Sequence, residues 1–400
     1  MDFHRIGIAI ERESVFARRV LTGLVSALPR FKERGFDFDL RFLYDSLARN
    51  KRELDDFDGF IAQVQNPEMA RALTATGKPV VDVLYKQRYE NCAVVNPDNH
   101  AIARLVVEHL LSRRFRHFAF CGREGVFYSD DRCRAFKKLL ADAGFEMVSY
   151  TLTPRAAHEY FLGKDPRKEL KVEDPLDAAN LRRWVKQLPS GTAVFCCQDL
   201  RAYQLLRICK EEEIQIPSHI ALVGVDDDPI FCHFTTPRLS SVNPDAERVG
   251  DETLELLAMA FTENRPLAFA DSRFIEPRAL SVRESSEIFS YDPPWLGEAL
   301  AYIYRHISEN LSAEDVYRAI NKSHTVVDRY FRMVLGTSVQ KIIIKTRLER
   351  AAFLLKTTDL PIKTILRQSG YSSFSYFCTS FSRFYGITAE EYRERKSCGI

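Results

Sequence analysis

Apolar and polar positions from residue 5 to about residue 284 alternate between short apolar runs and amphipathic stretches. The runs typical of buried strands are RIGIAI, FDLRFLY, DGFIAQV, KPVVDV, NCAVVN, HFAFCG, EMVSYTL, TAVFCCQ and IALVGVD. Helical periodicity lies between many of them, over residues 14–28, 99–111, 130–143, 177–188 and 200–213. This alternation predicts parallel sheets with helices on both faces, and the segment is long enough for two such α/β lobes.

The pattern changes near the Pro-Pro pair at residues 293 and 294, after which only helical periodicity continues. We therefore predict an α/β domain over residues 1–284, a linker over 285–294 and an all-helical domain over 295–400. Ligands of open α/β sheets bind beyond the carboxyl ends of the strands. The loops that follow the predicted strands are therefore where a binding site is expected.

Two stretches of the helical part, residues 311–336 and 360–386, share one layout. Each has a short helix, a tight turn containing Asn321 or Gly370, and a second helix that ends in an aromatic cluster and a glycine. Units of this kind place their second helix in the major groove of DNA. The layout therefore predicts two helix-turn-helix motifs.

The predicted motifs cover about residues 312–335 and 361–385, and a connecting helix is predicted over about 338–356. At ~1.5 Å per residue, this connector is roughly 28 Å long. That length is near the ~34 Å between successive major-groove faces. One rigid connector would therefore hold two DNA-reading helices in adjacent grooves.

The second predicted reading helix is unusually rich in aromatic and hydroxyl side chains. Its helical spacing puts one set of rings on a face that we expect to be buried, namely Phe374, Phe377, Phe381, Phe384 and Tyr385. The opposite face carries Ser375, Tyr376, Thr379, Ser380, Ser382 and Arg383. This face is short and nearly uncharged, so it would lie flat against a large partner. An ordinary amphipathic helix is the alternative interpretation.

The charge distribution agrees mildly with a polyanionic partner for the helical part. The whole chain carries a formal net charge of +2, whereas residues 285–400 carry 16 Lys and Arg against 12 Asp and Glu. An excess of this size favours nucleic acid as a partner of the C-terminal part. A solvated surface with scattered charge would look similar.

The nine cysteines show no paired C-x-x-C spacing, and several lie inside apolar runs such as AVFCCQ. They are typical of reduced core residues in a cytosolic protein. The N-terminal sequence lacks the apolar stretch of a signal peptide, and the chain has no run of 18 apolar residues. We therefore expect a cytoplasmic protein without a membrane-spanning segment.

The sequence carries no G-x-G-x-x-G, Walker, G-x-S-x-G or H-E-x-x-H motif, and its histidines do not cluster with Cys or carboxylates at ligand spacing. We therefore predict no catalytic residue, no metal and no cofactor. The run Asp226-Asp227-Asp228 leaves metal or acid/base chemistry, and with it a sugar-processing enzyme, as the weaker alternative.

Residues 295–395 resemble the AraC-type DNA-binding domain, on the segments RLERAAFLL, GYSSFSYFCTSFSRFYG and ITAEEYRER. The resemblance covers about a quarter of the chain. Three positions depart from the family pattern. Ala389 stands where Pro is usual, and Leu366 replaces a small Ala. Thr379 stands where many members place a base-reading Arg, which changes the base contact expected in the second motif.

This resemblance implies DNA contacts for eight side chains. The base-facing candidates are Thr325, Asp328 and Arg329 in the first reading helix, and Ser375 and Thr379 in the second. The candidates for phosphate contact are Lys322, Arg332 and Arg383. Phosphate contacts position a protein on DNA without specifying sequence. A solvated surface side chain is the alternative for each position.

Residues 4–284 resemble the LacI-type regulatory core, which is itself similar to periplasmic sugar-binding proteins. The segments that carry the resemblance are VVNPDNHAIARLVVEHLL, DDRCRAF and IALVGVDDDPIFCHFTTPRLSSVNPDAERVG. Each segment is modest alone, but they occur in the family's order. The resemblance implies a two-lobed sensor that closes on a small molecule.

It also implies an effector site built from Phe16, Arg132, Gln198, Asp199 and Asp226. Arg132 would bond ligand hydroxyls, Asp226 would accept a pair of them from the other lobe, and Phe16 would stack on a sugar face. Gln198 and Asp199 would line the ligand from another loop. Carboxylates, amides and one aromatic plane are the groups that a sugar requires.

Structural roles are the alternatives at three of these positions. Phe16 would pack against a helix N-terminus, Asp199 would be an N-cap, and Arg132 would pair with Asp130 or Asp131.

Two further positions depart from known sugar binders. Pro244 replaces a Gln, and Leu84 replaces a carboxylate. The pattern of hydroxyl groups bound must therefore differ. We expect the side chain of Asp227 to point away from the cleft that Asp226 faces, because successive side chains alternate at a strand end.

A LacI-type sensor ahead of an AraC-type domain implies a sugar-responsive transcription regulator that binds promoter DNA. D-xylose or another pentose is the first expectation for the effector, and activation of sugar catabolic genes is the expected outcome. Another sugar, a sugar phosphate or a nucleobase is the alternative effector. The expected partners are an operator duplex, a second copy of the chain in a homodimer, and RNA polymerase.

Overall fold

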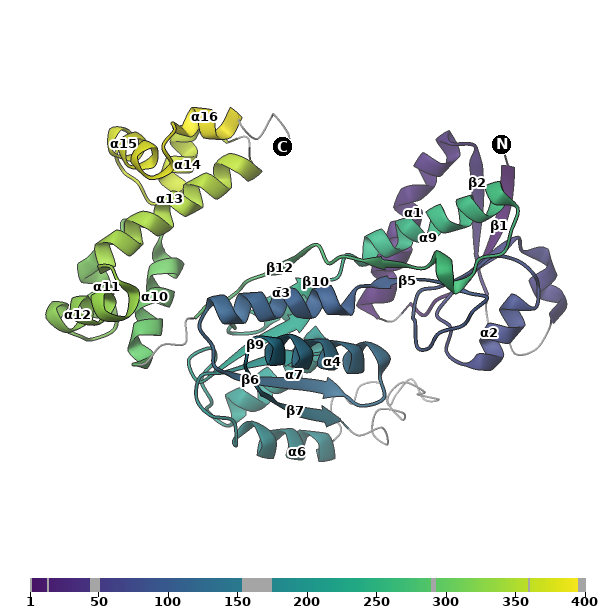
Figure 1. Ribbon diagram of the computed structural model, residues 1–400, viewed down its shortest axis with the longest axis horizontal. Helices are drawn as coiled ribbons and strands as arrows, with labels where there is room; N and C mark the ends of the chain where they lie inside the picture. The colour runs from purple at the N-terminus through teal and green to yellow at the C-terminus, as the bar shows by residue number, and fades with distance from the viewer. Residues whose placement is uncertain are drawn as a thin grey trace. The chain divides into compact units, whose positions relative to one another are not determined.

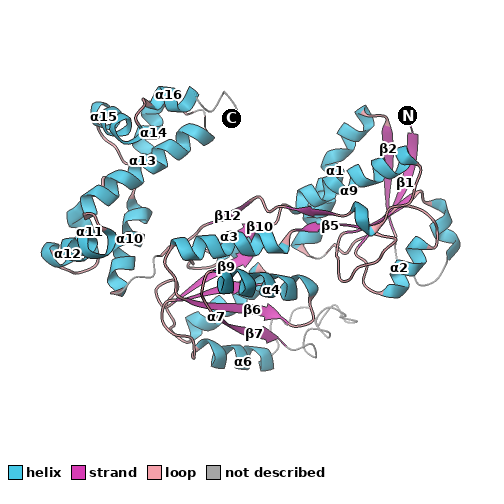
Figure 2. Ribbon diagram, in the orientation of Figure 1, coloured by secondary structure: helices cyan, strands magenta, loops and turns pink. Residues whose placement is uncertain are grey.

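The computed structural model describes residues 2–12, 14–43, 51–152, 175–288, 293–358 and 360–394. It forms two compact units, Met1–Ser286 and Glu287–Ile400. Of the linker expected over 285–294, residues 289–292 lie outside the described residues, as does Cys398. Figures 1 and 2 show an α/β first unit and, in the described part of the second unit, helices joined by loops.

The first lobe of the first unit is built on a parallel six-stranded sheet. The strand order is β11 (Arg273–Ile275), β5 (Ala93–Pro97), β4 (Val80–Asp82), β3 (Gly59–Ala62), β1 (Asp2–Ala9) and β2 (Phe36–Phe42). The helical elements of this lobe are α1 (Val15–Glu33), η2 (Lys51–Asp56), α2 (Pro67–Thr74), α9 (Ala246–Glu263) and η3 (Phe269–Asp271). The helices α1 and α9 lie side by side and cover the apolar core on one face of the sheet.

The second lobe has its own six-stranded sheet, in which only the pairing of β12 with β10 is antiparallel. The order is β12 (Ala279–Ser281), β10 (Ser240–Asn243), β9 (Ile220–Val225), β8 (Thr192–Cys196), β6 (His117–Arg123) and β7 (Met147–Leu152). Its helices are α3 (Asn99–Ser112), α4 (Phe127–Asp142), α6 (Pro175–Val185), α7 (Asp199–Glu211) and α8 (Pro229–Phe234).

The chain passes between the lobes three times, from β5 into α3, from β10 into α9 and from β11 into β12. The predicted fold class, two α/β lobes followed by a helical part, is confirmed. The short strands β10, β11 and β12 were not predicted. They have three or four residues each and, unlike the equally short β3 and β4, do not lie inside a longer apolar run.

The second unit consists of helices α10 (Pro294–His306), α11 (Ala313–Ala319), α12 (His324–Leu335), α13 (Val339–Thr357), α14 (Ile362–Gln368), α15 (Phe374–Tyr385) and α16 (Ala389–Glu394). Its apolar side chains form two clusters. One joins α10, α11 and α12 to the start of α13, through Val339 and Ile343. The other joins α14, α15 and α16 to the rest of α13, through Leu348, Ala351 and Leu355. The helix α13 therefore belongs to both cores, as a rigid connector must.

The tight turns have clear local causes. Ser312 and Asp315 form a capping box that begins α11. Asn321, in the turn before α12, has a φ of +50°, which Asn tolerates. Gly370, before α15, has a φ of +77°, and a Cβ there would lie 2.1 Å from the carbonyl oxygen of Ile307. Only glycine fits at that position.

The predicted core face of α15 is wrong in part. Phe377 and Phe381 are fully buried, but Phe374 is 45% and Phe384 is 47% exposed. The neighbouring helices α13, α14 and α16 cover only a narrow stripe of α15, so the rings at its two ends extend beyond them. Helical spacing defines a face, but the packed neighbours decide how wide the buried part of that face is.

Candidate effector cleft and nucleic-acid interface

Asp226 directly follows strand β9, at the end of the sheet where ligands of α/β folds bind. Its φ is +115° and that of Asp227 is +48°, both unusual for residues other than glycine. Arg19, from the first turns of α1, donates from Nη1 to the carbonyl oxygen of Asp226 at 2.5 Å and from Nη2 to that of Asp227 at 2.8 Å. One arginine of the first lobe therefore holds this strained turn of the second lobe.

Arg132 is buried in the first half of α4. Its Nε donates to Asn99 Oδ1 at 2.9 Å and its Nη1 donates to the carbonyl oxygen of Cys197 at 2.5 Å. The ring of Tyr128 lies 5.1 Å from the guanidinium carbon. These contacts fix the guanidinium in one orientation. The predicted alternative, an ion pair of Arg132 with Asp130 or Asp131, is not what these contacts show.

The charges of Arg132 and Asp226 influence each other. Burial raises the pKa of Asp226 to about 6, while the positive charges of Arg132 and Arg19 lower it and the negative charge of Asp228 raises it. Arg132 is the stronger of the two positive influences on this carboxyl group. The structure thus brings together two residues that lie 94 positions apart in the sequence. A carboxylate that can accept and a guanidinium that can donate therefore lie at the ends of the neighbouring strands β9 and β8.

Asp199 has a different position from the one expected. It is the first residue of α7, whose N-cap is Gln198, and its carboxylate is buried. Its Oδ1 accepts from Ser241 Oγ at 2.6 Å, and its Oδ2 accepts from the backbone nitrogen of Asp228 at 2.8 Å. Burial and the charge of Asp226 hold the pKa of Asp199 well above its usual range. Oδ2 therefore holds the β9–α8 turn, while Oδ1 is bonded to strand β10.

Strand β9 passes very close to the carboxylate of Asp199. A Cβ on Gly224 would lie 2.1 Å from Asp199 Oδ1, so the strand can approach it only with glycine at that position. Gln198 also bonds within the protein, because its Oε1 accepts from the Tyr128 hydroxyl at 2.6 Å. Phe16 is the second residue of α1 and packs, partly buried, against the core of the first lobe.

Asp82, which sequence reasoning did not single out, ends β4 as a fully buried carboxylate. It accepts backbone hydrogen bonds from Val64 at 3.1 Å, Leu84 at 2.8 Å and Tyr85 at 3.1 Å. Burial raises the pKa of Asp82 to about 6 against the effect of these bonds. The carboxylate orders the loops after β3 and β4. In the sequence, the only feature that could have indicated this role of Asp82 is its position directly after an apolar run.

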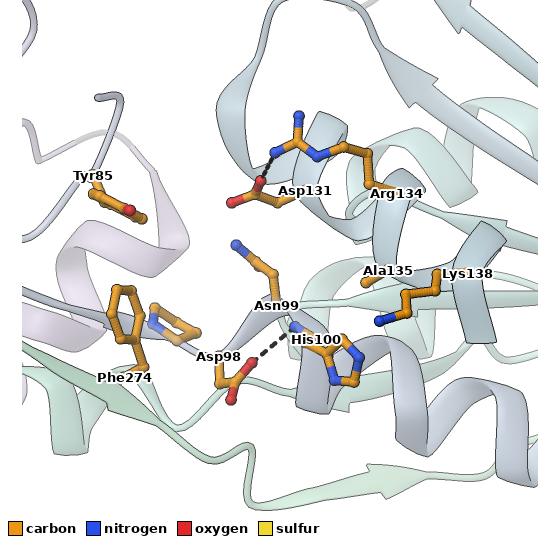
Figure 3. A pocket seen from close by; sticks show the side chains of 10 residues that line it. Tyr85, Asp98, Asn99, His100, Asp131, Arg134, Ala135, Lys138 and Phe274 are labelled. Atoms are coloured by element: carbon orange, nitrogen blue, oxygen red, sulfur yellow. Dashed lines mark hydrogen bonds and ion pairs between the residues drawn. The ribbon is translucent and has the colours of Figure 1, made fainter. Parts of the chain in front are cut away.

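A pocket of about 350 Å³ lies where the two lobes meet at the start of α3. Figure 3 shows Tyr85 and Phe274 on one side and residues of α4 on the other. The complete lining is Tyr85, Pro97, Asp98, Asn99, His100, Asp131, Arg134, Ala135, Lys138 and Phe274. The five predicted effector residues do not line this pocket. Asn99, which does line it, accepts a hydrogen bond from Arg132. Sequence reasoning missed the two rings, because nothing in their local pattern marks them.

The helical unit repeats one arrangement twice. In α12, Val327 and Phe331 are buried, and in α15 the equivalent Phe377 and Phe381 are buried. The first three residues of each helix, 324–326 and 374–376, are exposed, as are Arg329 and Thr379 between the buried positions. The two second helices therefore present equivalent exposed faces, which is the arrangement that places a recognition helix in a groove.

On α12, Thr325, Arg329 and Arg332 are exposed, as is Lys322 in the preceding turn. Asp328 is not free to face bases as predicted. Its Oδ1 accepts from the Tyr317 hydroxyl at 3.2 Å, and its Oδ2 lies 3.2 Å from His324 Nε2 and 3.8 Å from Arg332. The largely buried carboxylate instead holds the side chains around it.

On α15, Ser375, Thr379 and Arg383 are exposed. The Thr379 hydroxyl donates to the carbonyl oxygen of Ser375 at 3.0 Å, an ordinary bond within a helix that can exchange for an outside partner. Arg383 lies in the last turn, at the opposite end of the helix from Ser375. A guanidinium there suits a phosphate better than a base edge.

Among the residues that the structure describes, no group of His, Cys, Asp and Glu side chains is arranged to hold a metal ion. In the same residues, no helix is both long and apolar enough to cross a membrane.

Family models match two separate parts of the chain. The model of a periplasmic binding protein-like domain matches residues 107–286, and a helix-turn-helix domain model matches residues 317–395. The xylose operon regulatory protein of Escherichia coli strain K12 is 25% identical over 403 residues, which cover 98% of each chain.

Solved structures show the same fold. The xylose-binding transcription activator XylR aligns with a TM-score of 0.64 and 23% identity, covering 98% of both chains. The transcriptional regulator CelR in complex with cellobiose aligns with a TM-score of 0.53 and 22% identity, over 70% of this chain and 84% of that one. Both resemblances predicted from the sequence, that of the sensor and that of the DNA-binding domain, are confirmed.

Proposed function

We propose a function from the premise that this chain is a transcription regulator, not an enzyme, of the type of the xylose operon regulatory protein, with a periplasmic-binding-protein-like sensor ahead of an AraC-type DNA-binding domain. In this proposal the chain binds a small sugar between its two lobes, and binding changes how its two reading helices act on promoter DNA. The proposed setting is the cytoplasm.

The observation that carries the sugar proposal is the placement of Arg132 and Asp226 at the same edge of one sheet: Arg132 is bonded to Cys197 just after β8, and Asp226 follows the neighbouring strand β9. The carboxylate of Asp226 can accept two hydroxyl hydrogen bonds, and each is charge-assisted. The guanidinium of Arg132 has donors left after its bonds to Asn99 and Cys197. The rings of Tyr85 and Phe274 in the adjoining pocket would cover the C–H face of a sugar.

D-xylose or another pentose is the first candidate effector. The name of the E. coli relative and that of the solved activator both point to xylose, and the pocket of about 350 Å³ is at the small end of ligand pockets. A sugar phosphate is the second candidate, because Lys138 lines the same pocket and would attract an anion, while Arg134 is paired there with Asp131.

The proposed consequence of binding is a shift in the population of sensor conformations, to the extent that the ligand prefers one of them. We further propose that the chain acts as a homodimer on two half-sites and activates sugar catabolic genes through contact with RNA polymerase. Two reading helices in each copy would give a dimer four contacts with the operator.

A thermal-shift screen of the full chain tests the effector class. Free pentoses, hexoses, sugar phosphates and nucleobases are compared at equal concentration, because a ligand that binds only the folded state raises Tm. We expect a pentose to raise Tm, and calorimetry with the same sugar to give saturable binding. A response to sugar phosphates or nucleobases alone would replace the pentose. No response in any class would overturn the sensor proposal.

A further inference from the structure

The two reading helices differ in the chemistry of equivalent positions. The first residue of α12 is His324, whereas the first residue of α15 is Phe374. Five positions later, α12 carries Arg329 and α15 carries Thr379. The first helix thus offers a ring nitrogen and a guanidinium where the second offers a phenyl ring and a hydroxyl group.

Phe374 is exposed although it is apolar. It follows the N-cap Ser373, whose side chain accepts from the backbone nitrogen of Tyr376, so the first turn of α15 is well formed. Phe374 is 45% and Tyr376 is 52% exposed, while the next ring, Phe377, is fully buried. In a helix-turn-helix unit the N-terminal residues of the second helix contact the base edges. The exposed ring therefore lies where bases are read.

The major groove offers one apolar feature, the 5-methyl group of thymine. Guanine is read best by Arg or Lys, and adenine by Asn or Gln. In the first two turns of α15 the exposed side chains are Phe374, Ser375, Tyr376 and Thr379, which include no amide and no guanidinium. Bidentate reading of adenine or guanine is therefore not available to this part of the helix.

We propose that Phe374 recognises thymine by packing its ring on the 5-methyl group, so that the second reading helix selects thymine by apolar contact. The first reading helix selects bases by hydrogen bonds from Arg329. This inference rests on the proposed function, because it requires the helical unit to bind duplex DNA. The competing explanation is that Phe374 is one of the isolated exposed apolar residues found on every protein surface.

The test removes only the methyl group. Duplexes that the full chain binds are selected from a random-sequence library, and each thymine of the selected site is replaced in turn by deoxyuridine. At one or two thymines we expect replacement to weaken wild-type binding about three- to fourfold, the contribution of one buried CH₂-sized group. We expect Phe374→Ala to bind the thymine and deoxyuridine duplexes equally well.

Phe384→Ala is the matched control, because Phe384 is equally exposed on the same helix but lies in its last turn. This variant should keep the full difference between thymine and deoxyuridine. Phe374→Leu, which retains apolar contact, should keep part of it, and Tm of each variant verifies folding.

A selected site at which no thymine is sensitive to methyl loss would overturn the inference and leave the proposed function standing. The same holds if Phe374→Ala retains the difference or if Phe384→Ala loses it. Failure of the full chain to select any sequence would overturn both.

Discussion

The carboxylate of Asp227 accepts from Arg283 Nη2 at 2.7 Å, and both side chains are only 16% exposed. Ser281 donates to the other oxygen of Asp227 at 3.1 Å, and Arg283 Nη1 donates to the carbonyl oxygen of Leu239 at 2.9 Å. The turn that carries Asp226 is thereby joined to the segment just before Ser286, where the first unit ends. A residue next to the candidate effector site is thus fixed to the end of the sensor.

Replacing Arg283 by Met should destabilise the sensor. The change leaves Asp227 partly buried with only Ser281 as a side-chain partner, and a broken pair of this kind costs about 1–3 kcal/mol. Urea denaturation of the full chain, followed on the sensor transition, measures the loss. Arg238→Met is the control, because its pair with Glu284 leaves the arginine 56% exposed and such pairs contribute about 0–1 kcal/mol. Equal losses in the two variants would contradict the prediction.

The Asp227–Arg283 pair illustrates what a sequence pattern cannot provide. Alternation along a strand end predicts that the Asp227 side chain points away from the cleft, but it does not name the partner. Arg283 lies 56 residues further along the chain, and its approach depends on β12 pairing with β10. Periodicity is a local property, whereas such contacts are set by the register of short strands with no periodic signal of their own.

Asp226→Asn should abolish the response to the effector and leave operator binding intact. The amide keeps the shape of the carboxylate, and Asn tolerates positive φ, so the turn should form. Losing about 3 kcal/mol of charge-assisted hydrogen bonding would weaken effector binding more than a hundredfold. Calorimetry measures binding, and a mobility-shift titration without effector measures DNA affinity.

Asp227 cannot serve as the inert control for this experiment, because its carboxylate is paired with Arg283. Glu108→Gln, on an exposed position of α3, removes one negative charge outside the cleft. It should bind the effector like the wild type. Unchanged effector affinity in Asp226→Asn would mean that the carboxylate does not contact the ligand.

Effector affinity should fall as pH drops through about 6. Burial raises the pKa of Asp226 to about 6, so acid protonates a carboxylate that must accept two hydroxyl groups. Protonation of Asp226 affects folding stability in the opposite direction from effector affinity. Because this folded-state pKa is above the usual value, the folded form takes up protons more readily, and Asp226 opposes folding less at pH 5 than at pH 8. Calorimetry at both pH values tests the affinity.

Asp226→Asn supplies the control for the pH experiment, since it has no proton to gain and its residual affinity should show no step near pH 6. Asp199 titrates in the same region of the protein, but Ser241 and the backbone of Asp228 already engage its oxygens. A step of equal size in the variant would assign the titration to Asp199 or another group.

A candidate site could be predicted where a single helix or strand end determines its residues. It could not be predicted where contacts between separate elements determine them. The exposed positions Ser375 and Thr379 of α15 follow from helical spacing, and the exposed Thr325 and Arg329 of α12 follow from the resemblance to the AraC-type domain. The resemblance to the AraC-type domain placed Asp328 among the base-facing candidates, whereas its contact with Tyr317 depends on how α11 packs against α12. The same limit made Phe374 a predicted core residue, because the width of the buried stripe depends on neighbouring helices.

The two arginines of α12 should separate base reading from phosphate contact. Arg329 is exposed between the buried Val327 and Phe331, while Arg332 lies one turn further on, within 3.8 Å of Asp328. Arg329→Ala should weaken binding to the selected operator by about 1–3 kcal/mol and relax preference at one base pair, with little change on random DNA. Arg332→Ala should weaken binding to both duplexes by similar factors.

Salt dependence distinguishes these roles independently of sequence. Each phosphate contact contributes about −0.9 to the slope of log K against log salt concentration, because binding releases condensed counterions. The slope for Arg332→Ala should therefore be shallower than wild type by about that amount on both duplexes. The slope for Arg329→Ala should stay near the wild-type value on the operator, since a base contact releases no phosphate counterion. A shallower slope for Arg329→Ala, with equal losses on operator and random DNA, would assign Arg329 to the backbone instead.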